Sequence, residues 1–260
     1  MEEEKKEKFK PIIIMDFETG GLDCQNCAAT QLSLHAIRLD TLEQVGSRQY
    51  YFKPYIKQEE LGKPIRKTIK TKYEIEDEEE AKEETLIYDK DALAVSGITM
   101  DILNSQGMEL KEACEDMVAF FKSVKNSIGA NYKPILAGQN VRFDIGFLQQ
   151  IMSYTDTYKK IYTVLEGDVD FFGNFQPAYI DTLTLAQLAF MHNKQVTTYR
   201  LEALAERLGI DMDDAHDADA DVTATQDVLR TFIMRLRNAG GVAPVSTEQN
   251  KEKMRDHFKI

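Results

Sequence analysis

Cysteine is scarce in this chain of 260 residues, and long apolar runs are absent. Three cysteines cannot all pair with one another, which argues against a disulfide scaffold and favours a reducing compartment. No apolar run approaches the roughly 18–20 residues that cross a bilayer. The first residues are charged and lack the apolar stretch of about 7–15 residues that a secretory signal needs. We therefore expect a cytoplasmic protein with no membrane partner.

Basic residues are outnumbered, with 32 Lys and Arg against 44 Asp and Glu, for a net charge of −12. On bulk charge alone, this balance disfavours a nucleic-acid binder. The charge is unevenly spread, however, because residues 53–73 carry a net +5 and residues 74–84 a net −7. Composition favours a solvated surface loop at this place. The alternative is a basic finger that contacts phosphates, with the acidic run as its counterweight.

The hydrophobic content of 43% is that of a globular protein with a sizeable core. Three early strands with short connections predict antiparallel neighbours, and helices and strands alternate from residue 90 onward. The predicted strands are 11–17, 30–39, 47–53, 134–138 and 178–181, and the predicted helices are 108–125, 143–154, 182–192, 199–208 and 217–237. This order predicts an α/β fold, a mixed sheet with helices on its faces. We expect one domain at 11–239, a charged insertion at about 53–88, and tails at 1–10 and 240–260.

A pair of carboxylates lies where the first apolar segment ends. Side chains on a strand alternate with a period of two, so Asp16 and Glu18 point the same way. Two like charges at the end of a buried strand are costly unless a cation neutralises them, and Mg²⁺ prefers carboxylate oxygen. Taken alone, this short motif favours the alternative, a strand that ends in solvent with both acids hydrated.

Two further acids are predicted on the inner faces of helices. Asp144 and Asp221 each precede apolar residues at helical spacings of three to four and seven to eight residues. These spacings place each carboxylate on the stripe that faces the core. An acid in a first turn can also complement the helix dipole, which explains its position along the helix but not its face. The pattern therefore predicts a shared polar site.

A histidine precedes Asp221 by five residues. On a continuous helix the two would lie about 140° apart, so we expect His216 in the loop before the helix, folded back over the site. There it is a candidate general base near neutral pH, and a surface loop histidine is the alternative. Asp217 lies one helical turn before Asp221, and spacing does not choose between these two acids.

Three motifs occur in order along the chain: IIIMDFETGGLD at 12–23, GQNVRFDIGFL at 138–148 and HDADADVTAT at 216–225. They resemble the motifs of the DEDDh exonuclease family, the group that includes the proofreading epsilon subunit of bacterial DNA polymerase III. The resemblance runs from about residue 11 to 237 and implies a ribonuclease H-like fold with a mixed five-stranded sheet. Gln139, Gly20 and Val222 depart from the residues usual in the family, and none of these departures removes a ligand.

The resemblance also implies a chemistry. By position in the motifs, the four metal-binding carboxylates are Asp16, Glu18, Asp144 and Asp221, and the histidine is His216. Two Mg²⁺ or Mn²⁺ ions would clamp a phosphodiester, one activating water and the other stabilising the leaving 3′-oxygen. Asp16 would bridge both ions, and deprotonated His216 would take the water's proton. The implied activity is 3′→5′ hydrolysis of DNA with release of nucleoside monophosphates.

The end of the substrate is expected beside the first strand. Backbone groups would lie near the terminal nucleotide and an apolar side chain would pack on a base, a contact that tolerates any sequence. The expected contacts are Thr19, Gly20, Gly21, Leu22, Asn140 and Phe143. The expected partner is nucleic acid with a single-stranded 3′ end, DNA favoured over RNA, alongside replication or repair proteins.

Other functions remain open. An RNA-trimming 3′→5′ exonuclease would use the same ligands, because the 2′-hydroxyl is read by local contacts. A catalytically idle nucleic-acid or replisome interaction module has no physical need for four acids and a histidine. Cys24 and Cys27 have the spacing of zinc ligands, but a closed zinc site needs four. Only Cys114 and His35 are otherwise available to complete it.

Overall fold

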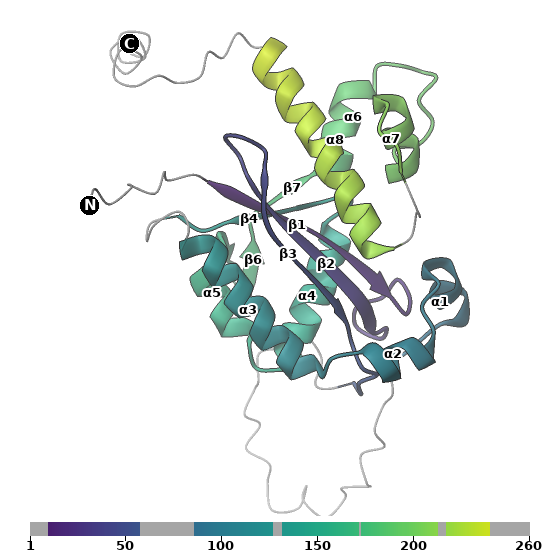
Figure 1. Ribbon diagram of the computed structural model, residues 1–260, viewed down its shortest axis with the longest axis vertical. Coiled ribbons are helices and arrows are strands. Elements are labelled where there is room, and N and C mark those ends of the chain that lie inside the picture. The colour runs from purple at the N-terminus through teal and green to yellow at the C-terminus, as the bar shows by residue number, and fades with distance from the viewer. Residues whose placement is uncertain (1–9, 58–85, 127–131, 172, 213–216, 240–260) are drawn as a thin grey trace, which may run out of the picture.

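The computed structural model describes residues 10–57, 86–126, 132–171, 173–212 and 217–239 (Figure 1). Five strands form one sheet in the order β3-β2-β1-β4-β7. They are β1 (Pro11–Thr19), β2 (Ala29–Arg38), β3 (Gln44–Tyr51), β4 (Ile135–Gly138) and β7 (Tyr179–Asp181). β2 pairs antiparallel with β1 and β3, whereas β4 pairs parallel with β1 and β7. The predicted mixed five-stranded sheet is confirmed.

Helices cover both faces of this sheet (Figure 1). The described helices are α1 (Lys90–Ser96), α2 (Met100–Gln106), α3 (Leu110–Asn126), α4 (Arg142–Tyr154), α5 (Tyr158–Val164), α6 (Thr182–Phe190), α7 (Leu201–Leu208) and α8 (Ala218–Ala239). α3, α4 and α5 pack in one apolar cluster on one face, and α8 packs on the other face with α6 and α7 beside it. None of the helices in the described ranges combines the length and apolar character needed to cross a membrane.

The alternation of β1 divides its side chains between these two layers. Ile13 and Met15 join the cluster beneath α3 and α4, whereas Ile12 and Ile14 join the cluster beneath α8. Because side chains on a strand alternate with a period of two, the even-numbered row continues through residues 16 and 18. The strand therefore presents its last two even positions on the α8 side of the sheet.

Several short elements were not predicted, although the short strands β4 and β7 were. α1, α2 and α5 have seven residues each, and a hairpin of β5 (Gly167–Val169) and β6 (Phe175–Pro177) has three residues in each strand. Strands of three residues are too short to show an alternation. α1 does carry a start and stop signal, because Asp89 caps its first turn and Gly97 ends it with a φ of 66°.

The residues at both ends of the predicted insertion, at about 53–88, pack inside the fold. Leu86 is buried. The backbone N–H of Tyr55 donates to the hydroxyl of Tyr88 at 3.0 Å. The hydroxyl of Tyr55 in turn receives the backbone N–H of Ala29 at 2.7 Å. Residues 58–85, together with the tails at 1–9 and 240–260, lie outside the described residues.

Candidate active site

Asp16 and Glu18 stand at the carboxyl end of β1, in the row of side chains that faces α8. Both are half-buried. The apolar residues before them hold the strand in the centre of the sheet, between β2 and β4. Strand pairing thus places two carboxylates at one end of the sheet, where solvent hydrates them only in part.

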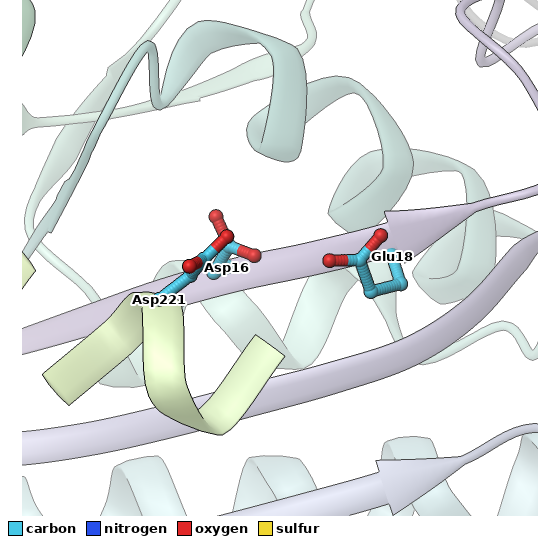
Figure 2. A group of neighbouring side chains, drawn as sticks. All are labelled: Asp16, Glu18 and Asp221. Atoms are coloured by element: carbon cyan, nitrogen blue, oxygen red, sulfur yellow. The ribbon is translucent and has the colours of Figure 1, made fainter. Parts of the chain in front are cut away.

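Asp221 approaches this pair from the first turn of α8. One carboxylate oxygen from each of Asp16, Glu18 and Asp221 can be chosen so that all three lie within 4.8 Å of one another. Figure 2 shows the carboxylates of Asp16 and Asp221 close together, with Glu18 further along β1. Such a group of oxygen donors suits a hard divalent cation. Within the described ranges, no other group of three acids, histidines or cysteines is arranged to hold a metal ion.

The carboxylates raise one another's pKa values. Burial raises the pKa of Asp16 well above its usual range, and the charges of Asp144, Asp221, Glu18 and Asp217 add to the rise. Burial raises the pKa of Glu18 to about 8, with further contributions from Asp221 and Asp217. With a pKa of about 8, Glu18 holds a proton at neutral pH. A bound divalent cation would relieve the same repulsion by displacing that proton.

Asp144 lies in the first turn of α4 and is buried, with 2% of its surface exposed. Its Oδ1 accepts the backbone N–H of Phe17 at 3.0 Å, which ties α4 to β1 between the two strand carboxylates. Burial raises the pKa of Asp144 well above its usual range, and the hydrogen bond from Phe17 opposes the rise. Asp144 is not among the three acids whose oxygens lie within 4.8 Å of one another, so the structure brings together three of the four predicted carboxylates in that group.

The structure separates the roles of Asp217 and Asp221, which spacing alone left open. The carboxylate of Asp217 caps α8, accepting the side-chain amide of Gln31 at 2.8 Å and the backbone N–H of Ala220 at 3.4 Å. The side chain of Asp221 instead joins Asp16 in the carboxylate group. The predicted general base, His216, lies outside the described residues.

The predicted substrate contacts of the second motif lie close to the carboxylates along the chain. Asn140 has a φ of 57°, and its backbone N–H donates to Oδ1 of Asp181 at 3.0 Å. Asp181 also caps α6. The half-buried ring of Phe143 lies 5.1 Å from that of Phe147, measured between centroids.

The remaining predicted contacts lie at the end of β1 and on the loop after it. The hydroxyl of Thr19 donates to the carbonyl of Gly21 at 2.8 Å, and the side chain of Leu22 is 89% exposed. A Cβ on Gly20 would lie 2.5 Å from the carbonyl oxygen of Ile87. This close approach gives a physical reason for glycine at position 20, where the family usually has threonine.

The loop after β1 is anchored by hydrogen bonds that the sequence does not reveal. The side-chain amide of Gln150 donates to the carbonyls of Cys24 and Cys27 at 2.7 and 2.8 Å, and its oxygen accepts the hydroxyl of Tyr55 at 2.7 Å. Further along the loop, Ile87 accepts from Ala28 at 3.1 Å through backbone groups. The loop that carries the predicted substrate contacts is therefore held by α4 and by both flanks of residues 58–85.

The two loop cysteines show no sign of a zinc site. Cys24 and Cys27 are free thiols, and burial raises the pKa of Cys24. Cys114 is a buried residue of α3 and donates to the carbonyl of Ile151 at 3.6 Å. No cysteine belongs to a potential metal-binding group anywhere in the part of the chain that the structure describes.

Known structures share this fold. E. coli exonuclease I in complex with a dT13 oligonucleotide is 20% identical, with a TM-score of 0.57, and the match covers 90% of this chain and 43% of that one. The zinc-bound form of E. coli exonuclease I with single-stranded DNA is also 20% identical, with a TM-score of 0.57, covering 88% and 41%. The moderately thermophilic exonuclease I from Methylocaldum szegediense is 20% identical, with a TM-score of 0.55, covering 88% and 40%.

The chain thus spans less than half the length of these structural neighbours. No protein of curated function matches it in sequence. A family model, described as exonuclease (RNase T), matches residues 87–229. The matched region holds Asp144 and Asp221, and it is more than half of the chain. By fold and by this match, the chain belongs to the exonuclease (RNase T) family.

Proposed function

We propose that this chain is a metal-dependent 3′→5′ exonuclease that removes nucleoside monophosphates from the 3′ end of DNA. The observation that carries the proposal is the group of carboxylates from Asp16, Glu18 and Asp221, three half-buried acids that converge within 4.8 Å. Like charges in that arrangement repel, so the group favours a cation at its centre. Membership of an exonuclease family supports the same reading.

The donor set fits Mg²⁺ or Mn²⁺. All its atoms are carboxylate oxygens, which hard cations prefer. In the proposal Asp16 and Glu18 of β1, Asp144 of α4 and Asp221 of α8 hold two such ions. When bound, the two ions would supply charge for the developing hydroxide and for the leaving 3′-oxygen.

The residues of the chain then have separate tasks. His216, as the proposed general base, takes the proton of the attacking water when its imidazole is neutral. This role would place the protein in the DEDDh subgroup, whose motifs the sequence resembles. The Phe17 N–H holds Asp144 at the site through its 3.0 Å hydrogen bond. The exposed Leu22 and the half-buried Phe143 offer apolar surface to the terminal base.

A single-stranded 3′ end is the proposed substrate. The exonuclease I structures with dT13 and with single-stranded DNA support this choice by fold analogy. DNA is proposed over RNA on the same ground. Replication or repair proteins are the proposed partners, because the motifs resemble those of a polymerase proofreading subunit.

End-labelled oligonucleotides test polarity and substrate together. Single-stranded DNA, duplex DNA and RNA of one sequence, each labelled at the 5′ end, are incubated with the protein and Mg²⁺. A 3′→5′ exonuclease shortens the labelled strand step by step, and we expect the fastest shortening with single-stranded DNA. Immediate release of a labelled mononucleotide would show the opposite polarity, and faster shortening of RNA would reassign the substrate.

A further inference from the structure

A row of polar side chains on β2 faces the start of α8. Gln31, Ser33 and His35 have exposures of 1%, 0% and 5%, so all three are buried. Residues two apart on a strand share a face, and the apolar residues between them face the other layer. Buried polar groups are costly unless they are hydrogen-bonded. The row therefore needs partners on the helix above it.

Gln31, the first residue of this row, forms a hydrogen bond with Asp217, the residue that caps α8. The side-chain amide nitrogen of Gln31 donates to Oδ1 of Asp217 at 2.8 Å. Its amide oxygen receives the backbone N–H of Ala218 at 3.5 Å. Gln31 thus contacts both the capping carboxylate and the first residue of the helix, and so holds the helix terminus against β2.

The other two members converge on a single carboxylate oxygen. The hydroxyl of Ser33 donates to Oδ1 of Asp219 at 2.7 Å, and Nε2 of His35 lies 3.2 Å from the same oxygen. Nδ1 of His35 lies 3.2 Å from Oε1 of Gln226, two turns further along α8. Which ring nitrogen donates depends on the tautomer of His35. Through its two ring nitrogens, His35 bridges two points along the same helix.

These bonds act next to a point of electrostatic repulsion. Asp221 follows Asp219 by two residues, and its charge raises the pKa values of Asp16 and Glu18. The repulsion between like charges pushes the start of α8 away from β1. The apolar stripe of α8, with Val222 and Leu229 packed on the sheet, sets which face of the helix turns inward. Directional hydrogen bonds at its first turn further constrain where that turn lies.

We propose that Gln31, Ser33 and His35 are positioning residues that hold the first turn of α8, through Asp217 and Asp219, so that the Asp221 carboxylate meets Asp16 and Glu18. This inference rests on the proposed metal-dependent function. It adds that metal affinity depends on a row of side chains in which no member belongs to the carboxylate group. Groups that orient metal ligands typically change metal affinity about 10–100-fold when they are removed.

Direct binding of Mn²⁺ to the full chain tests the proposal without relying on activity. Isothermal titration calorimetry would compare the wild type with His35→Ala, Ser33→Ala and His35→Gln. We expect His35→Ala to bind Mn²⁺ about 10–100-fold more weakly, and Ser33→Ala to lose a smaller factor in the same direction. His35→Gln keeps an amide that can donate to Asp219, so its affinity should recover most of the loss.

A matched control separates positioning from loss of stability. Val228 is fully buried on α8, in the cluster with Leu204 and Phe232, away from the polar row. Val228→Ala should lower the melting temperature by leaving a cavity, yet bind Mn²⁺ as tightly as the wild type. If His35→Ala does not fold, Ser33→Ala carries the comparison, because it removes a single hydroxyl.

The outcomes distinguish the two proposals. Wild-type affinity in folded His35→Ala and Ser33→Ala would overturn the positioning role and leave the metal site intact. An equal loss in Val228→Ala would also overturn it, because general destabilisation would then explain the effect. A wild-type chain that binds no Mn²⁺ would contradict the proposed function itself.

Discussion

Glu18 links metal binding to pH. Its ordinary pKa of 4.5 rises to about 8 in the folded chain, so between these values the metal-free folded state holds a proton that the unfolded state has lost. Folding stability must therefore fall as pH rises through this window, by up to about 1.4 kcal/mol per pH unit. Asp16 and Asp144 act in the same direction. Urea unfolding in chelator, at several pH values from about 5 to 8, measures this slope.

Mn²⁺ should reverse the trend, because deprotonated carboxylates bind the ion more tightly. The stabilisation that Mn²⁺ gives should thus grow from about pH 6 to about pH 8. Glu18→Gln keeps the size of the side chain without its titration, so its metal-free stability should depend less on pH. A Glu18→Gln variant with the wild-type slope would show that Glu18 is not the group responsible.

His216 should affect turnover and leave metal binding in place. A general base typically contributes about 10²–10⁴-fold to rate, so His216→Ala should lose about that factor in kcat. Raising the pH should partly rescue the variant, because more of the attacking water is then already hydroxide. Profiles of kcat against pH, with Mn²⁺ titrations of the same variant, measure both effects. Near-wild-type turnover in His216→Ala would remove the histidine from the mechanism.

Single residues also show where sequence reasoning reaches its limit. The alternation of β1 and the helical stripes predicted inward-facing acids at positions 16, 18, 144 and 221. The same reasoning left Asp217 and Asp221 equivalent, because their roles differ through the residues that each side chain contacts in the folded chain. Gln31 engages Asp217 at 2.8 Å, and it lies 186 residues away in sequence. Contacts at such a separation leave no periodic trace in one sequence.

At the level of elements, the loop after β1 depends on one partly buried tyrosine. The Tyr55 hydroxyl accepts from Ala29 and donates to Gln150, both at 2.7 Å. Tyr55→Phe leaves these buried groups unpaired, which should lower the free energy of unfolding by about 1–3 kcal/mol. Because the loop carries the proposed substrate contacts, KM for an oligonucleotide should rise while kcat changes little. Steady-state kinetics and urea unfolding measure the two effects.

Tyr162→Phe is the matched control for that substitution. Its hydroxyl makes one exposed hydrogen bond of 3.3 Å to the carbonyl of Gly173, so its removal should change stability by less than about 0.5 kcal/mol. A KM that stays at the wild-type value in Tyr55→Phe would contradict a role for the loop in substrate binding.

The long elements were predictable, as were the short strands β4 and β7, but the helices of seven residues and the β5–β6 hairpin were not. β1 has nine residues and α3 has 17. Each is long enough for the spacing of its apolar residues to identify it as a strand or a helix. β2 was predicted from its apolar face of Leu32, Leu34 and Ala36, but its polar face is also buried because α8 covers it. The β5–β6 hairpin is too short for periodicity, and only its pairing in the folded chain defines it.

For the whole molecule, the charged segment should be separable from the fold. Residues 58–85 carry six basic and ten acidic residues, and the chain on either side of them is packed through Tyr55 and Leu86. Replacing 58–85 by a flexible Gly/Ser linker should leave the melting temperature within a few degrees and mainly alter substrate affinity. Deleting all of 53–88 should unfold the protein, since that removes both packed flanks. Thermal unfolding of the two deletions compares them.

A second comparison asks whether the basic part of this segment contacts phosphates. Changing its basic residues to glutamine keeps the length of the chain. If Lys63, Arg66 and Lys67 contact the substrate, the dependence of KM on salt should become shallower. An unchanged salt dependence would favour the solvated loop that composition predicts.

The central claim is that the acids of β1, α4 and α8 make this chain a metal-dependent exonuclease. The most direct measurement is the shortening of a 5′-labelled single-stranded oligonucleotide by the wild type and by Asp16→Asn, with Mg²⁺ and with excess EDTA. Asp16→Asn should fold but lose nearly all activity, because it removes a charge from the carboxylate group. We expect progressive shortening by the wild type in Mg²⁺ alone. Equal shortening in excess EDTA, or by folded Asp16→Asn, would contradict it.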